Sequence, residues 1–404
     1  MFTLKTFTRK GALCLMLSTA MLTFSCTDNV EIPANEELDK LQLTVVEDYA
    51  KLVHANYDNA LQDALALQAA INTFVMDPTQ AHLDAAKTAW LASRESYGPS
   101  EAFRFYAGPI DDDNGPEGNL NAWPLDEAYI DYVVEGETVY ANGIVNMPEE
   151  YPTITAQLLT DLNEDGGEEN VSLGYHALEF LLWGQDLTAP EEKLAGQRPL
   201  TDFTTDQFAS RRLDYLKVTT EILIADLQGL VADWSPTSGG NYYASFVSES
   251  PATSLKNIFT GIGILAKAEL AGERIFTAYD NKNQEDEHSC FSDNTHRDII
   301  LNAEGLSNVF YGKYKGTDGK ETSGKGIYDL LKITDPALAE QVSTQVTTAL
   351  EKVNAMPVPF DFAISDEASR PKVLEAVVEL QQLGDEFAAA ASALDITINT
   401  ALPE

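Results

Sequence analysis

The chain has 404 residues, and 26 basic against 64 acidic side chains give it a formal charge of −38 at neutral pH. Such a surface repels phosphate backbones and excludes nucleic acid as an expected partner, whereas it attracts cations and favours solubility. A chain of this length is longer than a typical domain with a single hydrophobic core, which indicates two domains.

The first 25 residues differ in composition from the rest. Three basic side chains precede an uncharged, mostly apolar run over residues 11–25, which is too short to span a bilayer as a mature helix and is typical of a signal peptide. Residues 22–26 read Leu-Thr-Phe-Ser-Cys, like a lipoprotein cleavage box whose leucine is displaced by one place. We expect residues 1–25 to be a lipoprotein signal peptide and Cys26 to carry lipid, so that the protein is exported and anchored in the bacterial cell envelope, at the outer membrane or cell surface. An ordinary cleavage site beside an incidental cysteine is the alternative.

Residues 26–38 are polar and predict a tether. Beyond them, apolar residues recur every three or four positions, which is the pattern of helices with one buried face. We therefore expect helices in the segments 46–74, 79–105, 150–163, 171–184, 216–234, 251–280, 294–310, 336–355 and 367–395.

Strict alternation is nearly absent, and only residues 129–145 favour a small β-hairpin. The basic segment 313–325 lacks the hydroxyl that a phosphate-binding loop needs for magnesium, so we interpret it as a solvated loop. The polar stretch 188–199 contains two prolines and marks a domain boundary. We expect an all-α protein with two helical-bundle-like halves, 39–190 and 200–404, and at most a small β-hairpin. The similar order of helices in the two halves hints at duplication.

His176 and Glu179 lie three positions apart in a strongly apolar segment, so they share one face of a buried helix. A buried carboxylate beside an imidazole needs a metal, another cation or a shared proton. This pair suits iron, zinc or manganese, although a satisfied core histidine is the alternative. The segment also begins the His-x-x-Glu-His signature of zinc peptidases, but Phe180 replaces the second histidine.

Two arginines, a glutamate and two aromatic residues follow one helical face, at Trp90, Arg94, Tyr97, Glu101 and Arg104. Arginine mixed with aromatic residues is more typical of a polar interior or an interface than of a solvated surface. We expect Arg94, Glu101 and Arg104 to be buried and paired. The alternative to a ligand site is an internal salt-bridge network.

The segment 287–296 gathers two of the five histidines, His288 and His296, with Cys290. Helix capping explains some of its polar residues, but it does not explain both histidines and the cysteine. We therefore expect this segment, through Ser289, Asp293 and His296, to line a site.

These stretches together resemble the imelysin-like family, also called insulin-cleaving membrane protease-like. The Gly-x-His-x-x-Glu motif of that family is complete at Gly174, His176 and Glu179. The resemblance extends over roughly residues 40–395, and the stretches that carry it are 90–105, 108–111, 174–179 and 289–296.

The resemblance implies an all-helical protein with a site where the two halves meet. Family members are associated with iron-regulated uptake at the envelope. The resemblance therefore implies that the protein binds iron, as a metal ion or within a small iron-bearing ligand, with zinc as the alternative metal. It also implies an envelope transporter as a partner. The expected site residues are His176, Glu179, Glu101, Arg104, Arg94, Ser289, Asp293 and His296.

The family also carries a peptidase label, so enzymatic activity stays open at this stage. A metallopeptidase would need a third metal ligand. The candidates for that ligand are His288, His296, Glu101 and Asp293. A third hypothesis is a non-catalytic surface interaction protein whose polar interior is purely structural.

Overall fold

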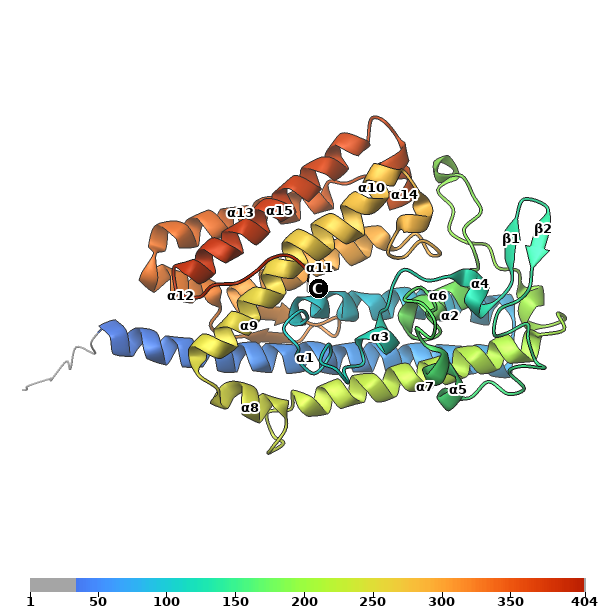
Figure 1. The fold of residues 1–404 in the computed structure, drawn as a ribbon, viewed down its shortest axis with the longest axis horizontal. Coiled ribbons are helices and arrows are strands. Elements are labelled where there is room, and N and C mark those ends of the chain that lie inside the picture. Colours follow the sequence, from blue (N-terminus) through green and yellow to red (C-terminus); the bar gives the residue numbers. More distant parts are fainter. Residues whose placement is uncertain (1–33, 403–404) are drawn as a thin grey trace, which may run out of the picture.

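The computed structural model describes residues 34–402, which form two layers of helices that run along the length of the molecule (Figure 1). The expected signal peptide, Cys26 and the tether up to residue 33 lie outside the described residues. Helix α1 begins at Ala34, so the end of the expected tether is helical. Glu36 and Glu37 occupy its first turn, where the helix dipole favours acidic side chains. Within the described part of the chain, no helix is both long and apolar enough to span a bilayer.

The first bundle consists of α1 (Ala34–Met76), α2 (Gln80–Tyr97), α6 (Gly174–Trp183) and α7 (Ala209–Asp233). Helix α1 packs along both α2 and α7, and α6 packs against α2 and α7. The shorter elements of this part are η1 (Gly98–Phe103), α3 (Glu117–Leu120), α4 (Glu127–Ile130), β1 (Val133–Glu135), β2 (Thr138–Tyr140), α5 (Ala156–Leu162), η2 (Pro190–Glu192), η3 (Leu200–Phe203) and α8 (Tyr242–Ser248).

The position of α7 corrects the expected division at residues 188–199. This helix follows that stretch in the sequence, yet it belongs to the first bundle and not to the second half (Figure 1). Its apolar positions, including Leu216, Leu223 and Leu227, are fully buried. A loop rich in proline therefore interrupts the first bundle without ending it.

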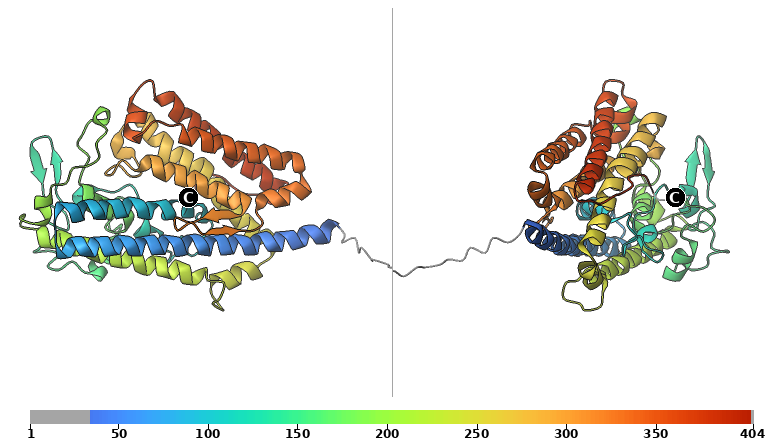
Figure 2. Two further views of the ribbon diagram at one scale, coloured as in Figure 1. Left: turned by 180° about the vertical axis from the view of Figure 1, so that it is seen from behind. Right: turned by 60° about the vertical axis from the view of Figure 1, so that its left-hand side comes forward.

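The second bundle forms the other layer, as the two further views also show (Figure 2). Helix α15 (Arg370–Ser392) packs against α13 (Pro336–Asn354) and against η4 (Leu265–Thr277), a π-helix that continues α9 (Pro251–Ile264). Helix α11 (Thr295–Tyr311) lies between this layer and the first bundle. The remaining elements are α10 (Ala278–Asn281), η5 (Gln284–Asp286), β3 (Lys313–Lys315), β4 (Glu321–Ser323), α12 (Ile327–Thr334) and α14 (Phe360–Ser365).

The two bundles meet most closely where α11 crosses η1. A Cβ atom on Gly305 would collide with the Pro99 carbonyl, and one on Gly98 would lie 2.6 Å from the Cβ of Leu301. At Gly98 the chain changes from α2 to the 3₁₀-helix η1, which has Pro99 near its start. Small residues on both sides therefore let the backbones approach at the junction that carries the candidate site.

The described residues contain two small antiparallel hairpins, β1–β2 and β3–β4. The first confirms the hairpin expected within residues 129–145. The second corrects the interpretation of residues 313–325 as a solvated loop. Tyr314 is buried between exposed Lys313 and Lys315, and its hydroxyl donates to the side-chain oxygen of Asn59 at 2.8 Å. The Lys-Tyr-Lys alternation is the two-residue pattern of a strand with one buried face.

A buried carboxylate holds the irregular part of the first bundle together. Asp131 accepts hydrogen bonds from Arg198 at 2.7 Å and from Arg212 at 2.6 Å, and all three side chains are almost fully buried. Burial opposes ionisation of Asp131, but the two arginines outweigh it and lower its pKa. Sequence patterns alone do not reveal this network, because its members are dispersed over residues 131–212.

Candidate metal and ligand site

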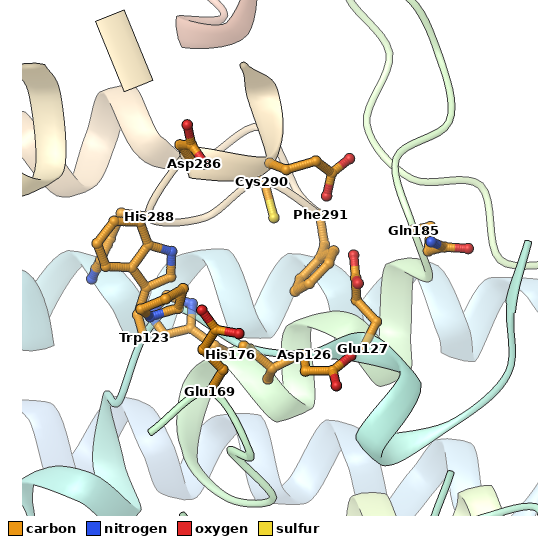
Figure 3. Close-up of a pocket in the computed structure, with 13 residues that line it drawn as sticks. Trp123, Asp126, Glu127, Glu169, His176, Gln185, Asp286, His288, Cys290 and Phe291 are labelled. Atoms are coloured by element: carbon orange, nitrogen blue, oxygen red, sulfur yellow. The ribbon is translucent and has the colours of Figure 1, made fainter. Parts of the chain in front are cut away.

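A cavity of about 420 Å³ opens at the junction of the two bundles (Figure 3). His176 on α6 and Trp123 line it from the first bundle, while His288, Cys290 and Phe291 line it from the loop that precedes α11. The segment 287–296 is thus brought beside His176, as expected from the sequence. The other lining residues are Pro124, Leu125, Asp126, Glu127, Glu169, Gln185, Glu285 and Asp286.

The Gly-x-His-x-x-Glu motif occupies the start of α6. Gly174 has a φ of +83°, and a Cβ there would lie 2.5 Å from the carbonyl oxygen of Leu120, so only glycine fits both the backbone conformation and the space. One helical turn then places His176 Nδ1 3.0 Å from Glu179 Oε2. Both side chains are almost completely buried.

Glu179 connects α6 to the second half of the chain. Its Oε1 accepts hydrogen bonds from the backbone N–H of Ser292 at 2.9 Å and from the Ser292 hydroxyl at 2.7 Å. Burial raises the pKa of Glu179 to about 8, although the Ser292 hydroxyl opposes this shift. With both oxygens engaged, Glu179 serves to position His176 and the loop.

His288 forms a second imidazole–carboxylate pair, with Asp298. Its Nδ1 lies 2.9 Å from Asp298 Oδ2, and the other carboxylate oxygen accepts from Arg94 Nε at 3.2 Å. The Ser289 hydroxyl also donates to Asp298. Burial opposes ionisation, but Arg94, together with His288 and Ser289, holds the pKa of Asp298 far below its usual range. The expected site residue Ser289 therefore acts on Asp298, which the sequence analysis did not single out.

The two imidazole rings meet edge to face, with centroids 4.6 Å apart and an interplanar angle of 78°. In each ring Nδ1 faces a carboxylate, whereas the buried Nε2 of both His176 and His288 has no hydrogen-bond partner among the described residues. Burial lowers the pKa of His176 well below 6.5, and it lowers that of His288 to about 4. Both rings are therefore neutral near pH 7, the state in which imidazole binds metals.

Arg94 and Glu101 are buried and paired as expected, but they support the cavity without lining it. Arg94 donates to Asn121 at 2.6 Å, and Asn121 donates to Glu101 at 3.2 Å. Glu101 also accepts from Arg104 at 2.8 Å and from Arg274 at 2.7 Å. Burial opposes ionisation of Glu101, but Arg274 and Arg104 hold its pKa well below the usual range. Arg104 is only partly buried, with 14% of its side chain exposed.

The structure does not bring Asp293 or His296 to the histidine cavity. His296 directs Nδ1 to the carbonyl oxygen of Asp293 at 3.0 Å, and neither residue lines the cavity. The loop turns here because Asp293 adopts a left-handed conformation with a φ of 58°. Ser292 consequently faces Glu179, while the Asp293 carboxylate lies beside Asp186 and Asp361.

The donor set at the cavity is incomplete for a zinc enzyme. Among the described residues, His176 and His288 belong to no group of three His, Cys, Asp or Glu whose ligand atoms all lie within 4.8 Å of one another; the group that meets this limit is elsewhere. A catalytic zinc site normally has three protein ligands. The cavity mouth is acidic instead, and burial, with repulsion from Glu285, raises the pKa of Glu127 to about 7.

The sequence of this chain is similar to those of a known protein family. The model of the imelysin family matches residues 53–387. The chain belongs to the imelysin family. Iron-regulated protein A of Synechococcus elongatus is 25% identical over 343 residues, which cover 83% of this chain and 81% of that protein.

Two solved structures of imelysin-like proteins share the fold. A protein assigned as an iron-regulated protein A precursor from Parabacteroides distasonis has a TM-score of 0.68 at 22% identity, covering 88% of this chain and 95% of its own. An imelysin-like protein from Psychrobacter arcticum has a TM-score of 0.59 at 16% identity, covering 91% and 98%. The expected family and mostly helical fold are confirmed.

The pairing of Glu101 generates a stability prediction. Glu101→Gln removes the charge that compensates Arg274 and Arg104, and the loss should approach the roughly 3–5 kcal/mol typical of a broken buried ion pair. Glu137→Gln is the matched control, because Glu137 is exposed in the turn of the β1–β2 hairpin. Urea unfolding should show a large loss for the first variant and about 0.5 kcal/mol or less for the second. Equal unfolding free energies would contradict the assignment.

Proposed function

We propose that this protein binds iron, as the ferrous ion or within a small iron-bearing ligand, at the cavity between His176 and His288. The observation that carries the proposal is the pair of neutral imidazoles, each with Nδ1 held by a carboxylate and with Nε2 lacking a hydrogen-bond partner in the described part of the chain. Carboxylates behind metal-binding histidines fix the ring orientation and raise ligand basicity. Imidazole suits iron among other transition metals, and iron-regulated relatives favour iron here.

The open donor set favours capture and release over catalysis by the metal. Two imidazoles leave several coordination positions for water or for oxygen donors carried by an incoming ligand. Acidic side chains at the cavity mouth, including Asp126 and Glu285, would concentrate cations near the entrance. A metallopeptidase would need a third protein ligand, and none of the expected candidates other than His288 lines this cavity.

In this proposal, iron binding serves iron uptake at the cell envelope. The basic, apolar leader that precedes Cys26 supports a lipid anchor, and a protein held at the membrane could pass its iron to an envelope transporter. The transporter is a partner that this role requires.

Loss of either histidine should abolish tight binding. His176→Ala and His288→Ala each remove one of the two imidazoles, so each should weaken Fe²⁺ binding by more than the about 10–100-fold that loss of an outer-shell partner costs. Anaerobic equilibrium dialysis with Fe²⁺ alone measures this effect, and circular dichroism checks that helix content is retained. His82→Ala is the control, since that ring bonds to the backbone of Asp77 at the start of α2. Unchanged affinity in both site variants, or an absence of Fe²⁺ binding by the wild type, would refute the proposed site.

The affinity for Fe²⁺ should rise with pH. Metal binding requires His176 to keep its proton on Nδ1 and donate it to ionised Glu179, but the pKa of Glu179 is about 8 in the metal-free protein. Below that pH each binding event therefore releases a proton, and affinity should increase about tenfold per pH unit before levelling near pH 8. Titration of the histidines contributes little, because both of their pKa values are lowered.

Anaerobic titrations between about pH 5.5 and 7.5 test this proton linkage. Glu179→Gln should lose most of the slope because it has no carboxyl proton to release. Glu127→Gln removes the other group of the cavity with a pKa of about 7, and it should retain most of the slope. A slope that survives Glu179→Gln unchanged would assign the proton to another group.

The anchor is tested independently of metal binding. Cys26→Ala removes the thiol that would accept lipid, so the protein should leave the membrane fraction or keep its leader. Fractionation and the mass of the purified chain distinguish these results. Normal processing with unchanged membrane attachment would show that Cys26 is not the anchor.

A further inference from the structure

We propose a second cation site, at which the carboxylates of Asp186, Asp293 and Asp361 hold a hard divalent cation such as Ca²⁺. The three residues come from separate parts of the chain. Asp186 follows α6, Asp293 lies in the loop before α11, and Asp361 is in α14. This site uses none of the residues that bind iron in the proposed function and does not depend on it.

The geometry suits a cation of this size. One carboxylate oxygen from each aspartate lies within 4.8 Å of the other two. Calcium binds oxygen at about 2.3–2.6 Å, so ligands on opposite sides are up to roughly 5.2 Å apart. Three oxygens within 4.8 Å of one another can therefore coordinate one Ca²⁺ together.

Unpartnered buried oxygens provide a second observation. Asp361 is 2% exposed and Glu287 is 1% exposed, yet Asp361 Oδ1 and both oxygens of Glu287 have no hydrogen-bond partner among the described residues. The Thr295 hydroxyl is near enough to lower the pKa of Glu287 but makes no well-formed hydrogen bond to it. A buried carboxylate without a donor is costly, so this cluster needs a cation or protons.

Glu287 belongs to the same acidic cluster. Burial raises its pKa well above the usual value, and the carboxylates that raise it further are Asp361, Asp293 and Asp186. It adds negative charge near the three aspartates, but its oxygens are not among the ligand atoms that lie within 4.8 Å of one another. Oxygen ligands of this kind favour Ca²⁺ over the softer metals that prefer imidazole and thiolate.

The protein supplies little compensating positive charge. Lys193 lowers the pKa of Asp361, but its Nζ lies over the ring of Phe362, 3.7 Å from the ring centroid. Asp186 is oriented by the backbone N–H of Thr188 at 3.0 Å and by its hydroxyl at 2.8 Å, and both bonds use Oδ1. The other oxygen of Asp186 stays available for the cation.

A cation bound at this site would stabilise the loop 287–294, which lines the histidine cavity. Asp293 is adjacent to Ser292, which bonds Glu179, and Glu287 is adjacent to His288. Asp186 extends the same cluster to the chain that leaves α6. The bound ion would hold both sides of this junction and stabilise the folded protein, because the unfolded chain cannot assemble the ligands.

Calorimetric titration of the chelator-treated full-length protein with Ca²⁺ tests the site. We expect one Ca²⁺ per chain and a rise in melting temperature of about 3 °C at a hundredfold excess over Kd. Asp361→Asn and Asp293→Asn should each weaken binding at least about tenfold. Asp113→Asn, which removes the same charge from an exposed loop, should bind like the wild type. Asp293 is only partly buried, so its variant remains informative if Asp361→Asn does not fold.

The two sites can fail separately. His176→Ala should retain wild-type Ca²⁺ affinity even though it loses Fe²⁺. An absence of Ca²⁺ binding up to about 5 mM, a value near the weakest protein calcium sites, would overturn the proposal and leave a protonated acidic cluster. Equal affinity in the wild type and Asp293→Asn would also overturn it, as would loss of Ca²⁺ binding in His176→Ala.

Discussion

The buried charge of Asp298 is the constraint on which the junction of the two bundles depends. It pairs with Arg94 from the first bundle and with His288 and Ser289 from its own half of the chain. Arg94 keeps it ionised, so Asp298 must accept hydrogen bonds, and His288 must present its proton on Nδ1. The interaction that joins the bundles thereby leaves the lone pair on His288 Nε2 free at the cavity. The ion pair that joins the bundles therefore also fixes the tautomer of His288.

The two imidazole–carboxylate pairs look alike but differ in charge. Asp298 accepts a hydrogen bond from Arg94, whereas the hydrogen bonds that Glu179 accepts from Ser292 come from neutral donors. Hydrogen bonds from Ser292 do not offset complete burial, so the pKa of Glu179 is raised where that of Asp298 is lowered. Asp298 therefore stays ionised, whereas Glu179 gains or loses a proton near neutral pH. A cation entering the cavity can therefore displace a proton without leaving an unpaired charge behind.

Local patterns explain which features could be predicted. Helical periodicity located the long helices, and three-residue spacing placed His176 beside Glu179, because both patterns act within a few turns of the chain. Periodicity could not assign α7 to the first bundle, since it gives the buried face of a helix but not its neighbour. Sequence patterns also could not show that Arg94 pairs with Asp298 or that Glu101 pairs with Arg274. These partners are 204 and 173 residues apart in the sequence.

The histidines come from opposite sides of the junction, so binding of a metal at the proposed site would be coupled to the docking of the bundles. His176 is fixed in α6, while His288 lies in a loop held by Glu179 through Ser292 and by Asp298. A metal shared by the two rings would bind only the docked arrangement, so its binding free energy adds to the stability of the junction. By the same linkage, a partner that loosens this loop would lower metal affinity without touching either imidazole. The fold thus offers a route to release that requires no change in the ligands themselves.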